Sequence, residues 1–286
     1  MSTVLDTAPA PGAALSPRRH RWSAITLTAV SAYLAGTFAV AVAANPPGTG
    51  STGSPAGDAL MSLWLIPMLV GIGWLSIRRG PRLWRQGVVA AAVAVTTGAA
   101  ALSMDSGNMG GAIVMGGLAG LSWYAAARGF AAAGRRWIGN RIGLLTGLAV
   151  GLVLAGINLL DPLLASQGVH PGPVGPSLFG ALQPGLFEEL TFHVMPLAVW
   201  LVLRRGLPTT RWGWVALYAF LILPHSAMHV PDLVLSDPGQ ALWQTFYAGV
   251  VFGIPLIALQ IRRGALSAVT AHWAIDAVRF LVFGLS

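Results

Sequence analysis

Long apolar runs constrain this chain more than any other feature of its sequence. A run of roughly 17–25 apolar residues is long enough to cross the hydrocarbon core of a bilayer as a helix. We identify nine such runs: 23–44, 59–77, 87–104, 111–127, 142–160, 178–203, 212–230, 241–260 and 265–285. The sequence therefore predicts an all-α fold, a polytopic transmembrane bundle of about nine spanning helices.

Composition agrees with a membrane protein. Of the 286 residues, 55% are hydrophobic and only 9% are charged, whereas a soluble domain of this length carries roughly a quarter charged residues. The polar surface that would face water is missing. There is no cysteine, which excludes a disulfide framework, thiol catalysis and cysteine metal sites.

The net charge of +8 comes from 17 basic residues, all of them arginine. In a soluble protein such an excess would suggest nucleic acid, but here the arginines form short clusters between apolar runs, so we expect no nucleic-acid partner. Clusters precede the first run and follow the second, fourth, sixth and eighth, while the other links carry aspartate and no arginine. By the positive-inside rule, this alternation predicts a multi-pass protein of the cell membrane with a cytoplasmic N-terminus.

Three regions follow from this reading. Residues 1–22 are expected to form a disordered cytoplasmic tail, because Pro, Ala and small polar residues dominate it. Residues 23–139 hold the first four helices, and residues 140–286 form a second membrane region. The basic start and Ala41-Val42-Ala43 resemble a cleavable signal sequence, which would leave eight helices. Because the first run exceeds the usual 7–15 apolar residues, we expect an uncleaved anchor.

Small residues recur every four positions in two of the runs. They are Gly143, Gly147, Gly151 and Ala155 in the fifth run, and Gly116 and Gly120 in the fourth. Small residues at this spacing allow helix backbones to approach closely. The pattern indicates packing and carries no information about chemistry.

Ionisable residues inside the apolar runs are the strongest functional signal. A charge near the bilayer centre costs about 2.5–3.5 kcal/mol on insertion scales, so such residues usually face the bundle interior and serve a purpose. Eight of them occupy only the sixth, seventh and ninth runs: Glu188, Glu189, His193, His225, His229, His272, Asp276 and Arg279. A buried polar network that merely fixes packing is the alternative, and the concentration in three helices favours function over it.

Their spacing groups these residues into pairs. Residues four apart share a helix face, and three pairs have this spacing: Glu189 with His193, His225 with His229, and His272 with Asp276. Glu188 lies about 100° around the helix from its neighbour Glu189, so the two glutamates should have different partners. Arg279 follows Asp276 by one helical turn and could neutralise that carboxylate by forming an ion pair.

Glutamate with several histidines suits two chemistries. In the first, a carboxylate acts as general base on water while histidines support the developing oxyanion. In the second, His and Glu side chains bind a metal such as zinc, which lowers the pKa of bound water. For a metal, the candidate ligands are Glu188, His229 and His272. The sequence has no HExxH on one helix, so it does not indicate a conventional zincin.

The three polar stretches resemble the motifs of the CPBP intramembrane proteases, which are related to the type II CAAX prenyl endopeptidases and the Abi bacteriocin-immunity proteins. That family carries EExxxR, FxxxH and HxxxN or HxxxD on separate helices. PGLFEELTFHVMPL (184–197), LPHSAMHV (223–230) and AHWAID (271–276) are similar to these motifs and occur in the same order. The resemblance covers roughly residues 140–286.

The resemblance implies a role for each residue. Glu188 and His229 would activate the attacking water, and His272 and Asp276 would stabilise the oxyanion. A protonated Asp276 could donate that hydrogen bond, whereas an ionised one could not. Supporting roles fall to the remaining members of the set: Glu189, His193 and His225. The family is usually labelled metalloprotease, and a metal-free glutamate–histidine mechanism has also been argued for it.

Two positions depart from the family pattern. The arginine of the first motif is replaced by His193, and the phenylalanine of the second by His225. The prediction is an intramembrane endopeptidase that hydrolyses a peptide or membrane-protein substrate. There are two alternatives. One is a proton-coupled transporter, since intramembrane Glu, His and Asp chains serve proton relays. The other is an inactive membrane scaffold of the same fold.

Overall fold

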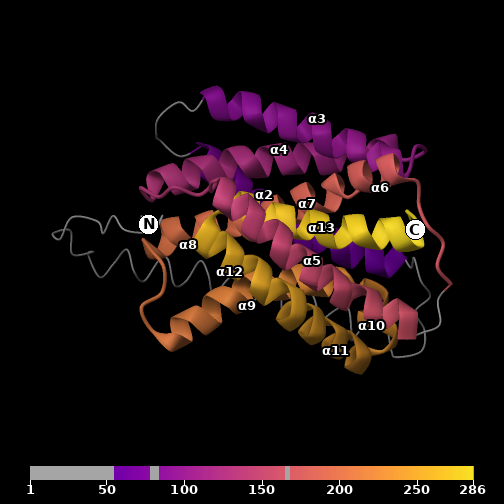
Figure 1. The fold of residues 1–286 in the computed structure, drawn as a ribbon. Coiled ribbons are helices and arrows are strands. Elements are labelled where there is room, and N and C mark those ends of the chain that lie inside the picture. The colour runs from indigo at the N-terminus through magenta and orange to yellow at the C-terminus, as the bar shows by residue number, and fades with distance from the viewer. Residues whose placement is uncertain (1–54, 78–83, 165–167, 286) are drawn as a thin grey trace.

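The computed structural model of the chain describes residues 55–77, 84–164 and 168–285. In these residues every regular element is a helix, and no strand occurs (Figure 1). The elements are α2 (Pro55–Ile77), α3 (Trp84–Met104), α4 (Met109–Ala132), α5 (Arg141–Leu164), α6 (Val174–Gly180), α7 (Leu182–Glu188), η1 (Glu189–Val194), α8 (Met195–Arg204), α9 (Arg211–Met228), α10 (Pro231–Ser236), α11 (Pro238–Ala248), η2 (Gly249–Gly253), α12 (Ile254–Arg263) and α13 (Ala265–Phe283). The tail predicted at 1–22 and the run at 23–44 lie outside the described residues.

Six of the described helical stretches are long and apolar enough to cross a membrane. They are Trp84–Met104, Met109–Ala132, Arg141–Leu160, Val174–Arg204, Pro238–Arg263 and Ala265–Phe283. The all-α, multi-pass character that the sequence predicts is thereby confirmed. Helix α9 is not among the six, because Arg211 at its start and Pro224, His225 and Ser226 near its end lower its hydropathy.

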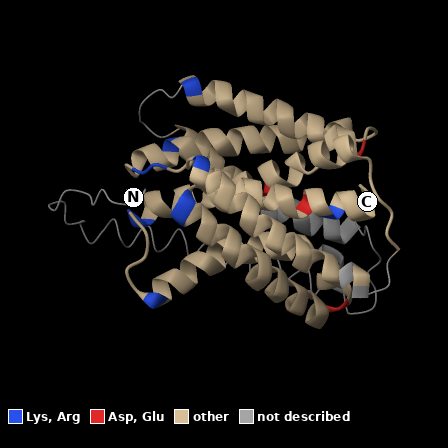
Figure 2. Ribbon diagram, viewed as in Figure 1, with Lys and Arg blue, Asp and Glu red and all other residues tan. Residues whose placement is uncertain are grey.

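The described arginines, with one exception, lie at a single end of the bundle. They occupy the start of α3, the end of α4, the start of α5, the end of α8, the start of α9 and the end of α12. In Figure 2 these positions form the blue group on one side, and a separate blue position lies on α13 toward the C-terminus. That exception is Arg279, the arginine of α13.

Two helix pairs come into backbone contact through the small residues that the sequence singles out. An added Cβ at Gly116 or Gly120 of α4 would lie 2.5 Å or 2.6 Å from a carbonyl oxygen of α3. On α5, Gly147 abuts the Ser267 carbonyl, and an added Cβ at Gly151 would lie 2.5 Å from the Ala271 carbonyl. The expected close approach is confirmed for both pairs, and it holds α13 firmly against α5.

The run at 178–203, expected as one helix, is divided into α6, α7, η1 and α8. Segment η1 is π-helical, and the N–H of Met195 bonds to the carbonyl of Leu190, five residues back. Segment η2 is also π-helical, and the N–H of Ile254 bonds to the carbonyl of Gly249. Each segment ends two residues before a proline, Pro196 or Pro255. A proline ring clashes with the carbonyl four residues earlier, and a locally wider turn relieves that clash.

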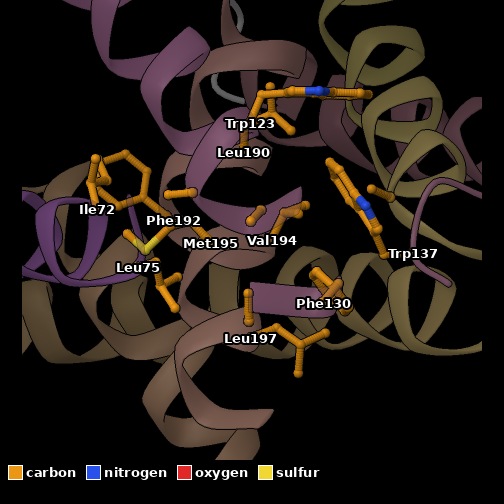
Figure 3. Packing of buried hydrophobic residues seen from close by; sticks show 14 of the residues in the cluster. Ile72, Leu75, Trp123, Phe130, Trp137, Leu190, Phe192, Val194, Met195 and Leu197 are labelled. Atoms are coloured by element: carbon orange, nitrogen blue, oxygen red, sulfur yellow. The ribbon is translucent and has the colours of Figure 1, made fainter. Parts of the chain in front are cut away.

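The main apolar core surrounds η1 and α8. Trp137 stacks on Phe130 with ring centroids 5.4 Å apart and lies 4.7 Å from the Trp123 ring. Figure 3 shows these rings on one side of the buried η1 and α8 side chains Leu190 and Leu197. Segment η1 contacts α4, α7, α8, α9 and α13, so the polar residues it carries are held by packing from several directions.

The α5–α13 contact predicts a sharp difference between two glycines of α5. Gly151→Leu should lower the midpoint of thermal unfolding in detergent by roughly 5 °C or more, since overpacking costs about 1–3 kcal/mol. The matched control is Gly156→Leu on the same helix, where an added Cβ meets nothing within 4 Å. Equal unfolding temperatures for the two variants would contradict this packing.

Candidate functional site

The polar residues predicted from the sequence converge around η1. Glu188 ends α7, while Glu189 and His193 belong to η1. Two helices that pack against η1 supply the others: α9 brings His225 and His229 at its C-terminal end, and α13 brings His272 and Asp276. All seven residues that the sequence marks as catalytic or supporting therefore come together, although up to 88 positions separate them in the chain.

The innermost layer of the site is a buried carboxylate between two histidines. Glu189 and His193 are both 0% exposed. Glu189 Oε2 lies 3.0 Å from His193 Nδ1, and its Oε1 lies 2.9 Å from His272 Nδ1. A buried carboxylate is stable only when its oxygens accept hydrogen bonds, and here each oxygen has an imidazole partner.

The second layer faces a cavity and centres on one oxygen of the other glutamate. Glu188 Oε2 lies 2.7 Å from His225 Nε2, 3.5 Å from His229 Nε2 and 3.5 Å from His272 Nε2. The His229 side chain is 52% exposed, against 18% for Glu188. The hydrogen-bond partners of the two glutamates differ, as their positions around the helix predict. Glu189 is enclosed by protein, whereas Glu188 stays accessible.

The two layers are joined by a contact between histidines. His193 Nε2 lies 3.1 Å from His225 Nδ1, with the rings edge to face. Phe192 stacks flat on the other ring, that of His225, at a centroid distance of 5.3 Å. The two residues that depart from the family pattern are thus each other's partners, and together they connect the two glutamates.

This connection fixes a minimum number of protons. Three hydrogen bonds run in series from Glu188 through His225 and His193 to Glu189, and each needs one proton. Two neutral imidazoles supply only two protons, because a neutral ring carries a single N–H. The third proton makes one of the rings a cation or one of the carboxyl groups neutral. The histidine pair can therefore supply the positive charge that an arginine would provide.

A cavity of about 200 Å³ opens beside the second layer. Its polar lining comes from α9 (His225, Ser226, His229), α13 (His272, Asp276, Arg279) and α5 (Asn158), and its apolar lining includes Phe252 and Gly253 of η2. A water occupies about 30 Å³ of liquid, so the space admits water together with a short stretch of a bound molecule.

Asp276 faces this cavity with unused hydrogen-bonding capacity. Its Oδ2 atom lies 3.3 Å from His272 Nε2, but the geometry is not that of a hydrogen bond, and this buried oxygen has no hydrogen-bond partner. The expected ion pair with Arg279 is wrong: within the described part of the chain, no ion pair joins the two side chains. One turn of helix separates them, and the cavity lies beside both.

Three of the side chains could hold a metal ion. Ligand atoms of Glu188, His225 and His229 all lie within 4.8 Å of one another. Glu188 Oε2 lies 2.7 Å from His225 Nε2 and 3.5 Å from His229 Nε2, and the two Nε2 atoms lie 3.3 Å apart. Tetrahedral zinc with bonds of about 2.0–2.1 Å places its ligand atoms about 3.3 Å apart. Two of the three separations are close to this value, and the third would have to widen from its hydrogen-bond distance, so the donor set could hold zinc after a small shift. The second ring nitrogen of His225 is held by His193, where a metal-bound histidine usually has a carboxylate, carbonyl or water partner.

This triad differs from the ligand set expected from the sequence. The sequence-based candidates were Glu188, His229 and His272, but His225 takes the place of His272 in the compact cluster. The reason is geometric: His225 and His229 lie one turn apart at the C-terminal end of α9 and bring their Nε2 atoms within 3.3 Å of each other, while His272 comes from a different helix, α13. Sequence reasoning gave His225 only a supporting role, although its i,i+4 spacing to His229 was the available signal.

Comparison with known proteins adds no relative. The chain matches no protein-family model, no curated protein and no solved structure at a significant level.

The contact between the two histidines predicts energetic coupling. His193→Phe and His225→Phe each leave a buried partner unpaired, which typically costs about 1–3 kcal/mol. The double variant removes both partners together, so its loss of unfolding free energy should be smaller than the sum of the single losses by about 1 kcal/mol or more. Denaturant unfolding in mixed micelles measures the cycle. Additivity within about 0.5 kcal/mol would show that the histidines do not depend on each other.

Proposed function

We propose that this protein is an intramembrane endopeptidase of the CPBP type, which hydrolyses a peptide bond of a membrane-associated substrate. The observation that carries the proposal is the environment of Glu188 Oε2. One oxygen of this partly exposed carboxylate lies within 3.5 Å of ring nitrogens from His225, His229 and His272, and these three histidines line a cavity that can hold water and substrate.

In this proposal Glu188 is the general base. A carboxylate beside a cavity can take a proton from water as the water attacks a carbonyl carbon. His229 is the most exposed histidine of the site, so it is placed to hold the same water or to protonate the leaving amine. His225 orients the base through its 2.7 Å contact with Glu188.

His272 and Asp276 would stabilise the oxyanion that forms during the attack. Both line the cavity, together with His225 and His229. Glu189 fixes the His272 ring through its Nδ1 atom, which leaves Nε2 directed toward Glu188 and Asp276. Preorganised donors of this kind commonly contribute the largest share of catalysis in acyl transfer. A protonated Asp276 would add a second donor from an oxygen that has no hydrogen-bond partner in the protein.

In an alternative form of the proposal, a zinc ion takes the place of the free carboxylate base. Glu188, His225 and His229 would hold the ion, and a bound zinc ion would supply Lewis-acid chemistry and a more acidic water. In either form of the reaction, the protein supplies the orientation of these side chains and the dry wall of η2 and α12.

The location follows from the same proposal. We place the protein in the cell membrane with nine spans and a cytoplasmic N-terminus, supported by the arginines gathered at one end of the described helices (Figure 2). The cavity would then open toward the outer half of the bilayer, since the C-terminal end of α9 and Arg279 of α13 lie away from that end.

A proton-coupled transporter is the alternative with some structural support, because the Glu and His side chains form a continuous chain of hydrogen bonds. A scaffold without catalytic activity is the other alternative. The protease and transporter proposals separate cleanly in liposomes, since only the transporter produces a flux that depends on a pH gradient.

Catalysis by Glu188 and His229 is tested by substitution. Glu188→Gln and His229→Ala should each reduce cleavage of a quenched-fluorescent hydrophobic peptide library by about 100-fold or more, the usual contribution of a general acid or base. Asp105→Asn, an acid in an exposed turn, is the matched control and should cleave at the wild-type rate. Full activity in Glu188→Gln protein, with its unfolding temperature unchanged, would refute the assignment.

Metal content is a separate prediction. Protein purified without chelators should contain about one zinc per chain, and Glu188→Gln and His225→Phe should each lower this occupancy at least tenfold, because each removes one of three protein ligands. His272→Phe should retain zinc, since His272 lies outside the triad. Mass spectrometry of metals measures this directly. Active wild-type protein free of metal would instead support the glutamate–histidine mechanism alone.

A further inference from the structure

Arg279 stands apart from the other described arginines in position and in contacts. It lies on α13 away from the end where the rest gather (Figure 2), so retention on the cytoplasmic side does not explain it. Its side chain is exposed and lines the cavity of the site. In the part of the chain that the structure describes, no carboxylate pairs with it, although Asp276 is only one turn away.

A second polar group reaches the same part of the cavity from α5. Gly147 abuts Ser267, and Gly151 abuts Ala271, so the two helices advance together in a fixed register. Two further turns along α5 lead to Asn158, and two further turns along α13 lead to Arg279; both residues line the cavity. Asn158 is half-buried among apolar neighbours, and its amide has no hydrogen-bond partner among the described residues.

These two side chains have the chemistry of an anion subsite. Guanidinium offers a planar pair of donors that matches a carboxylate, and in a partly desolvated wall such a charge-assisted pair is strong. An asparagine amide beside it can donate a further hydrogen bond. Arg279 is a cation on an apolar spanning helix with no carboxylate partner among the described residues, so a ligand that brings the negative charge would be favoured there.

The position of the subsite relates it to the proposed chemistry. Arg279 follows Asp276 by one helical turn, about 5 Å along the axis, and an extended peptide advances about 3.3 Å per residue. A group held by Arg279 would therefore belong to a residue one or two positions from the bond that is cleaved. The cavity of about 200 Å³ has room for such a short peptide segment but not for a two-chain phospholipid.

We propose that Arg279 and Asn158 form a carboxylate-binding subsite, which selects peptide substrates that carry a carboxylate one or two residues from the cleaved bond. The carboxylate comes either from an acidic side chain or from the chain terminus. This inference rests on the proposed protease function for its biological meaning, but the subsite itself can be measured by binding alone.

The test uses the full-length protein in phosphatidylcholine nanodiscs and three fluorescein-labelled Ala/Leu decapeptides. One ends in a free carboxylate, one ends in an amide, and one is amidated with Glu at the second-last position. Binding is measured by fluorescence anisotropy, and cleavage of the same peptides by mass spectrometry. Variants are Arg279→Gln, Arg279→Lys and Asn158→Ala, with Arg136→Gln as an exposed control at the opposite end of the bundle.

Wild-type protein should bind at least one of the two carboxylate peptides about tenfold or more tighter than the neutral amide, as expected for a charge-assisted hydrogen bond. Tighter binding of the peptide with the free C-terminus identifies the chain terminus as the source of the carboxylate. Tighter binding of the amidated Glu peptide identifies an acidic side chain. Arg279→Gln should bring the ratio of the dissociation constants of the amide and carboxylate peptides close to one. Arg279→Lys should keep part of the wild-type ratio, and Asn158→Ala should lower the ratio about threefold. Arg136→Gln should leave it unchanged.

Equal binding of all three peptides by the wild type would overturn the subsite, even if the peptides are cleaved. The subsite would also be overturned if the preference for carboxylate peptides over the amide peptide disappears when phosphatidylglycerol is added, because a lipid headgroup would then be the ligand of Arg279. Discrimination by charge without cleavage of any peptide would support the subsite and refute the proposed protease. Failure of one proposal is therefore distinguishable from failure of the other.

Discussion

The rest of the site depends on the burial of Glu189. A carboxylate enclosed by apolar helices has no water to solvate it, so its two oxygens must accept hydrogen bonds from the protein. They do so from His193 and His272, which belong to η1 and α13. This requirement fixes the orientation of both rings and, through the His193 ring, the position of His225 on a third helix. The accessible Glu188 is therefore surrounded by imidazoles whose positions are already set.

Proline shapes the walls of the site. Pro196 and Pro255 each follow a π-helical segment by two residues, and these segments, η1 and η2, lie at the buried carboxylate and along the cavity. Each proline prevents a regular α-helix at this point, and the wider turn changes the direction in which the preceding side chains project. The polar residues of η1, Glu189 and His193, are buried in the bundle interior, in directions that the wider π-helical turn sets.

The two positions at which the chain differs from the motifs it resembles, His193 and His225, contact each other. A histidine in place of the arginine beside Glu189 supplies less fixed charge, and a histidine in place of the phenylalanine gives that ring a partner at 3.1 Å. The third proton of the Glu188–His225–His193–Glu189 series, whether it lies on a ring or on a carboxyl group, offsets one of the two negative charges. The same histidine on α9 also completes the Glu188–His225–His229 triad. These two histidines therefore bear on the charge balance of the site, and His225 also belongs to the donor set available to a metal ion.

The sequence by itself determined the all-helical membrane character, the small-residue faces at which helices can approach closely and the identity of the polar residues. These depend on local quantities: run length, the spacing of small residues, and the cost of a charge in an apolar segment. Only the tertiary structure decided which residues meet. The contact between His193 and His225 and the place of His225 rather than His272 in the triad depend on how separate helices pack. The division of one run into α6, α7, η1 and α8 and the missing Asp276–Arg279 pair were likewise visible only in the structure. Periodicity specifies the face of a helix, but the register between neighbouring helices is fixed by close packing of their backbones, as at Gly147 and Gly151 of α5.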